Sequence, residues 1–116
     1  MWQLDLSSYE SVKQFAKKAE SLKRLDAVVE NAGVIPVKFK TVEQDETTLT
    51  VNVVSTFLLG LLMLPKLRET ASKFNTTPHL TIVSSEVHFF TSFPEKSSPN
   101  IFDKLNDKAT ANMPDR

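Results

Sequence analysis

A few polar or small residues in this chain stand at points where an apolar segment ends or is interrupted. They are Asn31, Gly33, Asn52, Ser84 and Ser85. Amide and hydroxyl side chains bind small molecules through hydrogen bonds, and a glycine lets a ligand or a backbone segment approach closely. These residues can act together only if the elements that carry them bring them to one place.

The asparagine and the glycine follow a predicted buried strand. Residues 25–29 are a short, largely apolar run with two adjacent valines, and the sequence ENAG follows it. Short apolar runs bounded by a glycine turn are typical of strands in parallel sheets. In open doubly wound sheets, ligands bind in the crevice outside the carboxyl ends of the strands. Asn31 and Gly33 are therefore predicted to lie at a binding edge.

A second buried strand is predicted at residues 79–84, HLTIVS. Ser84 and Ser85 lie at its carboxyl end, so they are expected to face the same crevice. A strand-to-loop cap is an equally good interpretation of the two serines. Asn52 interrupts the apolar segment 51–65. Its simpler interpretation is a hydrogen bond to a neighbouring loop.

The remaining elements alternate in an order that predicts an α/β fold. Residues 1–6 are interpreted as the end of a strand, and Ser7 with Glu10 forms a predicted capping box that begins a helix. A long helical pattern covers residues 42–74, and its centre is apolar nearly all round, which predicts burial on both sides. Pro65 is expected to kink or divide this helix. Strands that alternate with helices predict a parallel sheet.

Composition restricts the partners of the chain. Its 116 residues suit one domain, and 14 Lys and Arg balance 14 Asp and Glu, so neither nucleic acid nor an anionic membrane is expected as a partner. The apolar segment 51–65 is shorter than the roughly 20 residues of a membrane-spanning helix. The chain has no cysteine, and no metal-binding pattern surrounds His79 or His88, so no metal is expected. The N-terminus lacks a signal-peptide pattern, which favours a cytoplasmic protein.

The last part of the chain, residues 89–116, loses hydrophobic periodicity. It contains Pro94, Pro99 and Pro114 together with several serines and asparagines. This composition predicts a long loop that is either functional or disordered.

Taken in order, five segments of the chain resemble the short-chain dehydrogenase/reductase family, in particular its members similar to retinol dehydrogenases and fungal ketoreductases. The segments are LDLSSYESV at 4–12, ENAG at 30–33, VNVVSTFLL at 51–59, LLMLPKL at 61–67 and IVSSEVH at 82–88. The resemblance implies that residues 1–116 are the central part of one NAD(P)-binding, Rossmann-like domain. Such a domain is a doubly wound parallel sheet between two helical layers. Residues 89–116 would then be a flexible tail.

The resemblance also implies where a nicotinamide cofactor would bind. Asp5 and Leu6 would contact the adenine ring of NAD or NADP, and the family slightly favours NADP. Asn31, Ala32 and Gly33 would shape the floor of the cofactor site. The residue that distinguishes NAD from NADP in the family follows a strand for which this chain has no matching segment.

Two further residues acquire catalytic roles through the resemblance. Asn52 would hold a water molecule in the proton relay, and Ser85 would hydrogen-bond the carbonyl or hydroxyl oxygen of the substrate. Glu30 stands where the family's NNAG motif has its first asparagine, which changes the local hydrogen bonding. The implied activity is an NAD(P)-dependent oxidoreductase that interconverts an alcohol and a ketone or aldehyde.

The chain departs from the family pattern in its catalytic pair. The family has a tyrosine after the catalytic serine and a lysine four residues later, whereas no tyrosine follows Ser85. The only tyrosine, Tyr9, has Lys13 four residues later but precedes the other site residues, and we interpret this spacing as coincidental. The strand at residues 1–6 would also lack its neighbouring strands. We therefore expect a fragment that is inactive as it stands.

An alternative to the enzyme hypothesis is a non-catalytic interaction module. In many members of the family, the helix that corresponds to residues 42–74 packs against its copy in another subunit. The fragment would then pair through this helix with a full-length homologue or with itself. Packing of the same apolar helix within a core is an equally good interpretation.

Overall fold

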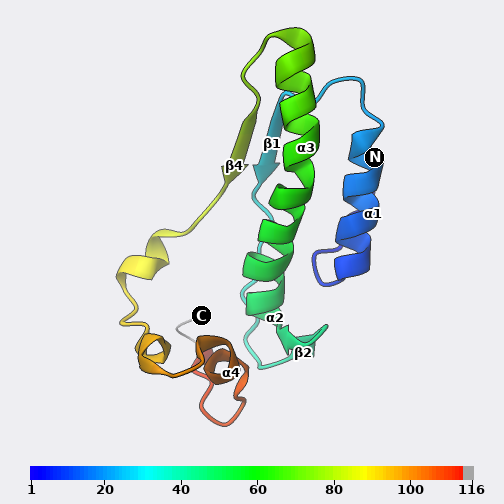
Figure 1. The fold of residues 1–116 in the computed structure, drawn as a ribbon. Coiled ribbons are helices and arrows are strands. Elements are labelled where there is room, and N and C mark those ends of the chain that lie inside the picture. Colours follow the sequence, from blue (N-terminus) through cyan, green and yellow to red (C-terminus); the bar gives the residue numbers. More distant parts are fainter. Residues whose placement is uncertain (114–116) are drawn as a thin grey trace.

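The computed structural model describes residues 1–113, and its centre is a unit of strand, helix and strand (Figure 1). Strand β1 (Ala27–Glu30) pairs in parallel with β4 (His79–Ile82) along its whole length. The long helix that ends with α3 (Thr56–Phe74) connects the two strands and contacts both of them. Both predicted strands and their parallel arrangement are confirmed, but their predicted burial is wrong, since Glu30 is the only buried residue of the pair.

Helix α1 (Tyr9–Glu20) precedes this unit and packs against α3. Its N-cap is Ser8, whose side chain accepts a hydrogen bond from the backbone N–H of Ser11. The predicted capping box of Ser7 and Glu10 is therefore wrong. The physical reason is a local turn, because the backbone N–H and the hydroxyl of Ser7 both donate to the Asp5 carboxylate.

The predicted strand at residues 1–6 is also wrong, since this segment has no regular secondary structure. A strand is stable only when a neighbour completes its backbone hydrogen bonds, and β1 pairs with β4 alone. The segment is held by side chains instead. The Ser55 hydroxyl donates to the Leu6 carbonyl oxygen at 2.6 Å, and the Asp5 N–H donates to the Ser11 hydroxyl at 3.0 Å.

The long helix begins later than its pattern predicted. Strands β2 (Thr41–Val42) and β3 (Asp45–Glu46) form a small antiparallel hairpin before it. The helix then comprises α2 (Thr47–Leu49), the π-helical segment η1 (Thr50–Ser55) and α3, and Glu46 caps its first turn by accepting from the Thr48 N–H. Pro65 lies inside α3 without dividing it. The departure from regular α-helix occurs at η1.

By length and composition alone, the 28 residues from Thr47 to Phe74 would suffice to cross a membrane. In this structure they instead pack against α1 and against both strands of the parallel pair. Core helices of globular proteins are apolar for the same reason, because they bury several faces at once. We interpret the helix as a core element.

The C-terminal part is a chain of short helical turns rather than a plain loop. It contains η2 (Glu86–Phe89), η3 (Pro94–Ser97) and α4 (Ile101–Asn106). Figure 1 shows this segment leaving β4 and returning beneath the N-terminal end of the long helix. Residues 114–116 of the predicted tail lie outside the described residues.

The core lies between α1 and α3. Its buried apolar side chains are Val12, Ala16, Ala19, Leu59, Met63 and Leu67. Val28 of β1 packs against this cluster, whereas the side chain of Val29 is 65% exposed. Because successive residues of a strand point to opposite faces, the second face of the pair is uncovered in residues 1–113. The described residues therefore supply the sheet and one helical layer of a partial Rossmann-like α/β fold.

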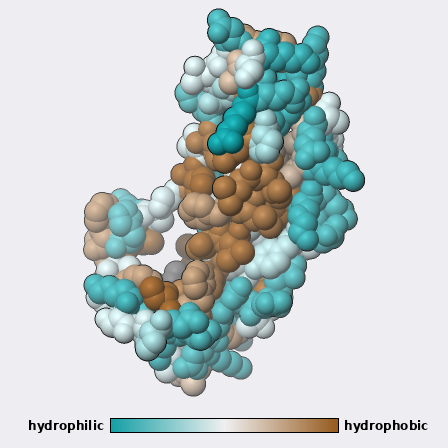
Figure 2. Space-filling model, viewed as in Figure 1, coloured by the Kyte–Doolittle hydropathy of each residue, from teal (hydrophilic) through white to brown (hydrophobic). Residues whose placement is uncertain are grey.

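Apolar side chains also gather on the surface of this layer. Figure 2 shows a continuous apolar area over the strands and the middle of the long helix, bordered by polar residues. Phe57 and Leu61 of α3 are 56% and 64% exposed, and Val83 after β4 is 50% exposed. Exposed apolar patches of this kind promote association.

We predict opposite effects of a lysine at two adjacent positions of β1. Val29→Lys should reduce aggregation and leave the folded structure intact, because the side chain points away from the core and a charge blocks edge-to-edge pairing. Val28→Lys should abolish folding, because it places a charge within the core. Light scattering and near-ultraviolet circular dichroism measure the two outcomes. Equal effects of both changes would show that the two faces of β1 do not differ.

Candidate functional site

A cavity of about 680 Å³ lies at the carboxyl ends of β1 and β4. Its lining includes Asn31, Ala32, Gly33, Asn52, Ser84 and Ser85. The volume falls within the range of about 300–1,000 Å³ that is typical of small-molecule sites. The structure thus brings together most of the residues that the sequence selected, at the edge of the sheet where parallel α/β folds bind ligands.

Asn52 fastens the long helix to the loop after β1. Its side-chain amide donates to the Val34 carbonyl oxygen and accepts from the Val34 N–H, both at 2.9 Å. A Cβ atom on Gly33 would lie 3.3 Å from Asn52 Oδ1, so glycine at this position allows the close approach. The simpler interpretation of Asn52, a hydrogen bond to a neighbouring loop, is confirmed. Its role in a proton relay stays a prediction.

The helix is locally π-helical where it carries Asn52, a feature that the hydrophobic pattern did not reveal. Segment η1 holds six residues, Thr50–Ser55, and the hydroxyl of Thr56 after it donates to the Val51 carbonyl oxygen at 2.9 Å. Single π-turns within α-helices recur at functional sites. The available signal in the sequence was the low helix propensity of TVNVVS, which consists of β-branched residues, an asparagine and a serine.

Ser85 ends the extended segment after β4 and caps the turn that follows. Its hydroxyl oxygen accepts from the Val87 N–H at 3.4 Å, and its carbonyl oxygen lies 2.5 Å from His88 Nδ1. The residue is exposed within the cavity. Because the hydroxyl acts here as an acceptor, its proton remains for donation to a ligand oxygen. The cap is present as interpreted, and the contact with a substrate stays a prediction.

Asp5 does not line this cavity. Its carboxylate accepts from the hydroxyl and the backbone N–H of Ser7, at 2.6 and 2.8 Å, and these hydrogen bonds lower its pKa. Leu6 lines a neighbouring cavity of about 170 Å³ together with Asn31 and Ala32. Leu6 therefore lies beside residues of the predicted binding edge, whereas Asp5 lines neither cavity. The predicted adenine contacts of both stay predictions.

Glu30 is a buried carboxylate that borders both cavities. The residue is 8% exposed, and neither oxygen has a hydrogen-bond partner among the described residues. A Cβ atom on Gly60 of α3 would lie 3.4 Å from Glu30 Oε1, so this glycine makes room for the carboxylate. Burial raises the pKa of Glu30. The only sign of this buried carboxylate in the sequence was a glutamate at the end of an apolar strand.

Tyr9 and Lys13 have structural partners in α1 and outside the site. The Tyr9 N–H donates to Glu43 at 2.8 Å, and Lys13 lies 3.7 Å from Glu10. Burial, followed by the nearby Asp45 carboxylate, raises the pKa of the Tyr9 phenol. Neither residue lines the cavity. Within residues 1–113, no group of three or more His, Cys, Asp or Glu is placed to hold a metal ion.

Comparison with known proteins identifies the class to which this site belongs. A family model described as short chain dehydrogenase matches residues 1–76. The chain therefore belongs to the short-chain dehydrogenase/reductase family. It is 49% identical over 114 residues to short chain dehydrogenase/reductase dmxR8 of Cryptosporiopsis sp. (strain 8999), with 96% of this chain and 35% of the relative covered.

A second relative is short chain dehydrogenase FGM9 of Gibberella zeae, at 42% identity over 115 residues, with 99% of this chain and 34% of the relative covered. The chain thus spans about a third of the length of these curated relatives. Among solved structures it is similar to NADH-dependent reductase A1-R′ complexed with NAD, with a TM-score of 0.59, 15% identity, and 89% and 43% of the two chains covered. This likeness supports the Rossmann-like fold.

Glu30→Gln is predicted to raise the free energy of unfolding near neutral pH, because it removes a buried charge and keeps the shape of the side chain. The raised pKa means that, above the ordinary glutamate value of 4.5, the folded state binds the proton more tightly than the unfolded state. Stability of the natural chain therefore falls as pH rises from 4.5 through the folded pKa. Urea unfolding across this range measures the effect.

The matched control for this prediction is Glu20→Gln, at an exposed position at the end of α1. It should leave the free energy of unfolding unchanged across the same pH range, because no buried charge is removed. A difference between Glu30→Gln and the natural chain that does not depend on pH would contradict the assignment of a buried, titrating Glu30.

Proposed function

We propose that this chain supplies the central part of an NAD(P)-dependent oxidoreductase that interconverts an alcohol and a ketone or aldehyde. The observation that carries the proposal is one cavity that contains the NAG turn, Asn52 and Ser85 at the carboxyl ends of two parallel strands. Membership in the short-chain dehydrogenase/reductase family supports it. The substrate would be a small molecule with a hydroxyl or carbonyl group.

The residues around the cavity fit part of a nicotinamide dinucleotide. Asn31, Ala32 and Gly33 are exposed at its floor, and they offer small side chains and backbone groups against which a flat ring or a ribose can pack. When bound, the nicotinamide supplies the hydride acceptor or donor of the reaction. Leu6, which lines the smaller cavity together with Ala32, would contact the apolar face of the adenine.

The chain's own polar residues would orient the substrate oxygen. Ser85 would donate a hydrogen bond from its hydroxyl to a substrate carbonyl oxygen, and this bond would polarise the carbonyl for reduction. Asn52 would keep the loop after β1 at a fixed distance from that oxygen through its two bonds to Val34. Tyr9 does not line the cavity, so a tyrosine acid is missing from it, and we propose that this chain by itself does not turn over substrate.

The binding part of this proposal is tested by titrating the isotope-labelled chain with NADP⁺ and with NAD⁺ and following its amide resonances. Shifts are expected at Asn31, Ala32 and Gly33, with NADP⁺ bound slightly more tightly than NAD⁺. Ala32→Leu should weaken binding about tenfold or more, because the larger side chain fills the floor of the cavity. Ala109→Leu, the same change at an exposed residue outside it, should have no effect.

Two outcomes would count against the proposal. Equal weakening by Ala32→Leu and Ala109→Leu would place the nucleotide elsewhere on the chain. Sustained alcohol or ketone turnover by the chain, lost in Ser85→Ala, would overturn the expected inactivity while supporting the role of Ser85.

A second candidate function is pairing through the long helix with a full-length homologue or with a second copy. The exposed side chains of Phe57 and Leu61 on α3 favour it, since apolar residues one turn apart on a helix form a stripe that another helix can cover. The covered area would replace the uncovered apolar surface seen in Figure 2.

Sedimentation velocity tests this pairing. The natural chain is expected to form a concentration-dependent dimer, and Leu61→Asp should shift it to the monomer, because a charge in the stripe remains unpaired in the interface. Ser72→Asp, at an exposed position near the end of the same helix, should leave the dimer unchanged. A natural chain that stays monomeric at all concentrations would remove this candidate.

A further inference from the structure

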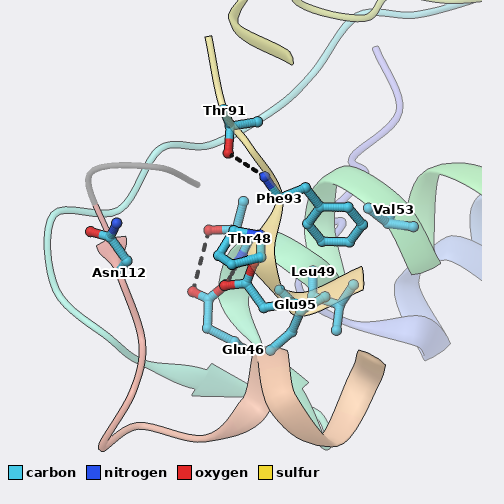
Figure 3. Close-up of a pocket in the computed structure, with 10 residues that line it drawn as sticks. Glu46, Thr48, Leu49, Val53, Thr91, Phe93, Glu95 and Asn112 are labelled. Atoms are coloured by element: carbon cyan, nitrogen blue, oxygen red, sulfur yellow. Dashed lines mark hydrogen bonds between the residues drawn. The ribbon is translucent and has the colours of Figure 1, made fainter. Parts of the chain in front are cut away.

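The C-terminal segment forms a second pocket against the beginning of the long helix. This tail pocket has a volume of about 210 Å³, and three separate parts of the chain line it (Figure 3). Its apolar lining consists of Leu49, Val53, Phe93, Pro94 and Leu105. The family resemblance assigned no role to the residues after 88, so the pocket is independent of the motifs that identified the site.

The tail pocket adjoins the cavity that contains Ser85. Val53 of the long helix lines both, so the two spaces meet at this residue. The tail pocket is smaller than the roughly 300 Å³ at which ligand sites begin. It therefore suits one part of a molecule whose remainder lies in the larger cavity.

Phe93, which lines the pocket, has a left-handed backbone conformation. Its φ of 45° and ψ of 65° are left-handed, which costs a non-glycine residue about 1–3 kcal/mol. The Phe93 N–H donates to the Thr91 hydroxyl at 3.2 Å, and Figure 3 shows the ring beside Val53. Strain of this kind persists where the surrounding structure holds it, and it often coincides with ligand sites.

The polar lining of the pocket is acidic. Glu46 is fully buried, and its carboxylate accepts from the N–H of Thr48 at 3.0 Å, while Glu95 of η3 also lines the pocket. The apolar side chains of the lining would leave a charged group poorly solvated. The pocket therefore suits an uncharged group.

The wall formed by the tail is fastened to the hairpin before the helix. Asn106 of α4 accepts from the Glu46 N–H at 2.7 Å and donates to the Asp45 carboxylate at 2.5 Å. These two bonds hold α4, and with it Leu105, against the start of the helix. The pocket is thus a built feature of the fold.

We propose that the tail pocket binds the apolar, uncharged body of the alcohol or carbonyl substrate, with its reacting carbon in the neighbouring cavity beside Ser85. This inference rests on the proposed function. It makes Phe93 and Val53 specificity-determining residues, and it names the substrate class as neutral molecules with an aromatic or aliphatic body attached to the reacting carbon.

The probe for this proposal is 4-fluoroacetophenone, a neutral aryl ketone whose binding to the full chain can be followed by fluorine NMR. Phe93→Gly should weaken binding about tenfold, because it removes the ring from the wall. The variant is expected to fold, since glycine adopts the left-handed conformation without strain. Phe90→Ala is the matched control, because Phe90 lies in the same segment, is 83% exposed and does not line the pocket. It should change the Kd less than about twofold.

The second part of the experiment varies the charge of the ligand. The anionic analogue 4-acetylbenzoate should bind at least about tenfold more weakly than 4-fluoroacetophenone. Equal binding of the two ketones, or equal effects of Phe93→Gly and Phe90→Ala, would overturn the proposal. If 4-fluoroacetophenone binding depends on Phe93 while NAD⁺ and NADP⁺ fail to bind, the tail pocket stands as a ligand site and the proposed oxidoreductase function fails.

Discussion

The contact between the long helix and the carboxyl end of β1 is the constraint on which the candidate site depends. At one level of the helix, Asn52 binds both backbone groups of Val34. Two turns further along, the absence of a side chain at Gly60 leaves space for Glu30. These contacts decide where the loop after β1 lies relative to the serines after β4. A small sheet of two strands can hold a cavity in place because the helix ties both strands to itself.

The parts of the fold that could be predicted from the sequence are those set by local pattern. The valines of β1 and the apolar run of β4 predicted a parallel pair, and the structure confirms it. The ends of the elements and the departures from regular structure could not be predicted, because they depend on contacts between segments. Residues 1–6 have strand-like composition but no strand beside them, and Ser7 turns toward Asp5 instead of capping α1.

The candidate site divides in the same way. Asn31, Gly33 and Ser85 were found because they follow strands, and the edge of a parallel sheet is a general binding location. The burial of Glu30 was missed because it results from Gly60, which is thirty positions away in the chain. The tail pocket was missed because Phe93 meets Val53 only after the tail returns beneath the helix. Distant contacts of this kind leave no periodic trace in a sequence.

The π-helical segment Thr50–Ser55 gives the helix a property that a regular helix lacks. A π-turn accommodates one more residue than an α-turn, so removing one residue there would leave a regular helix with better backbone geometry. The residues before the deletion would rotate about the helix axis relative to those after it, and Asn52 would no longer face the loop. A shorter helix could therefore be more stable and still lose the cavity, which places stability and ligand binding in opposition at this single turn.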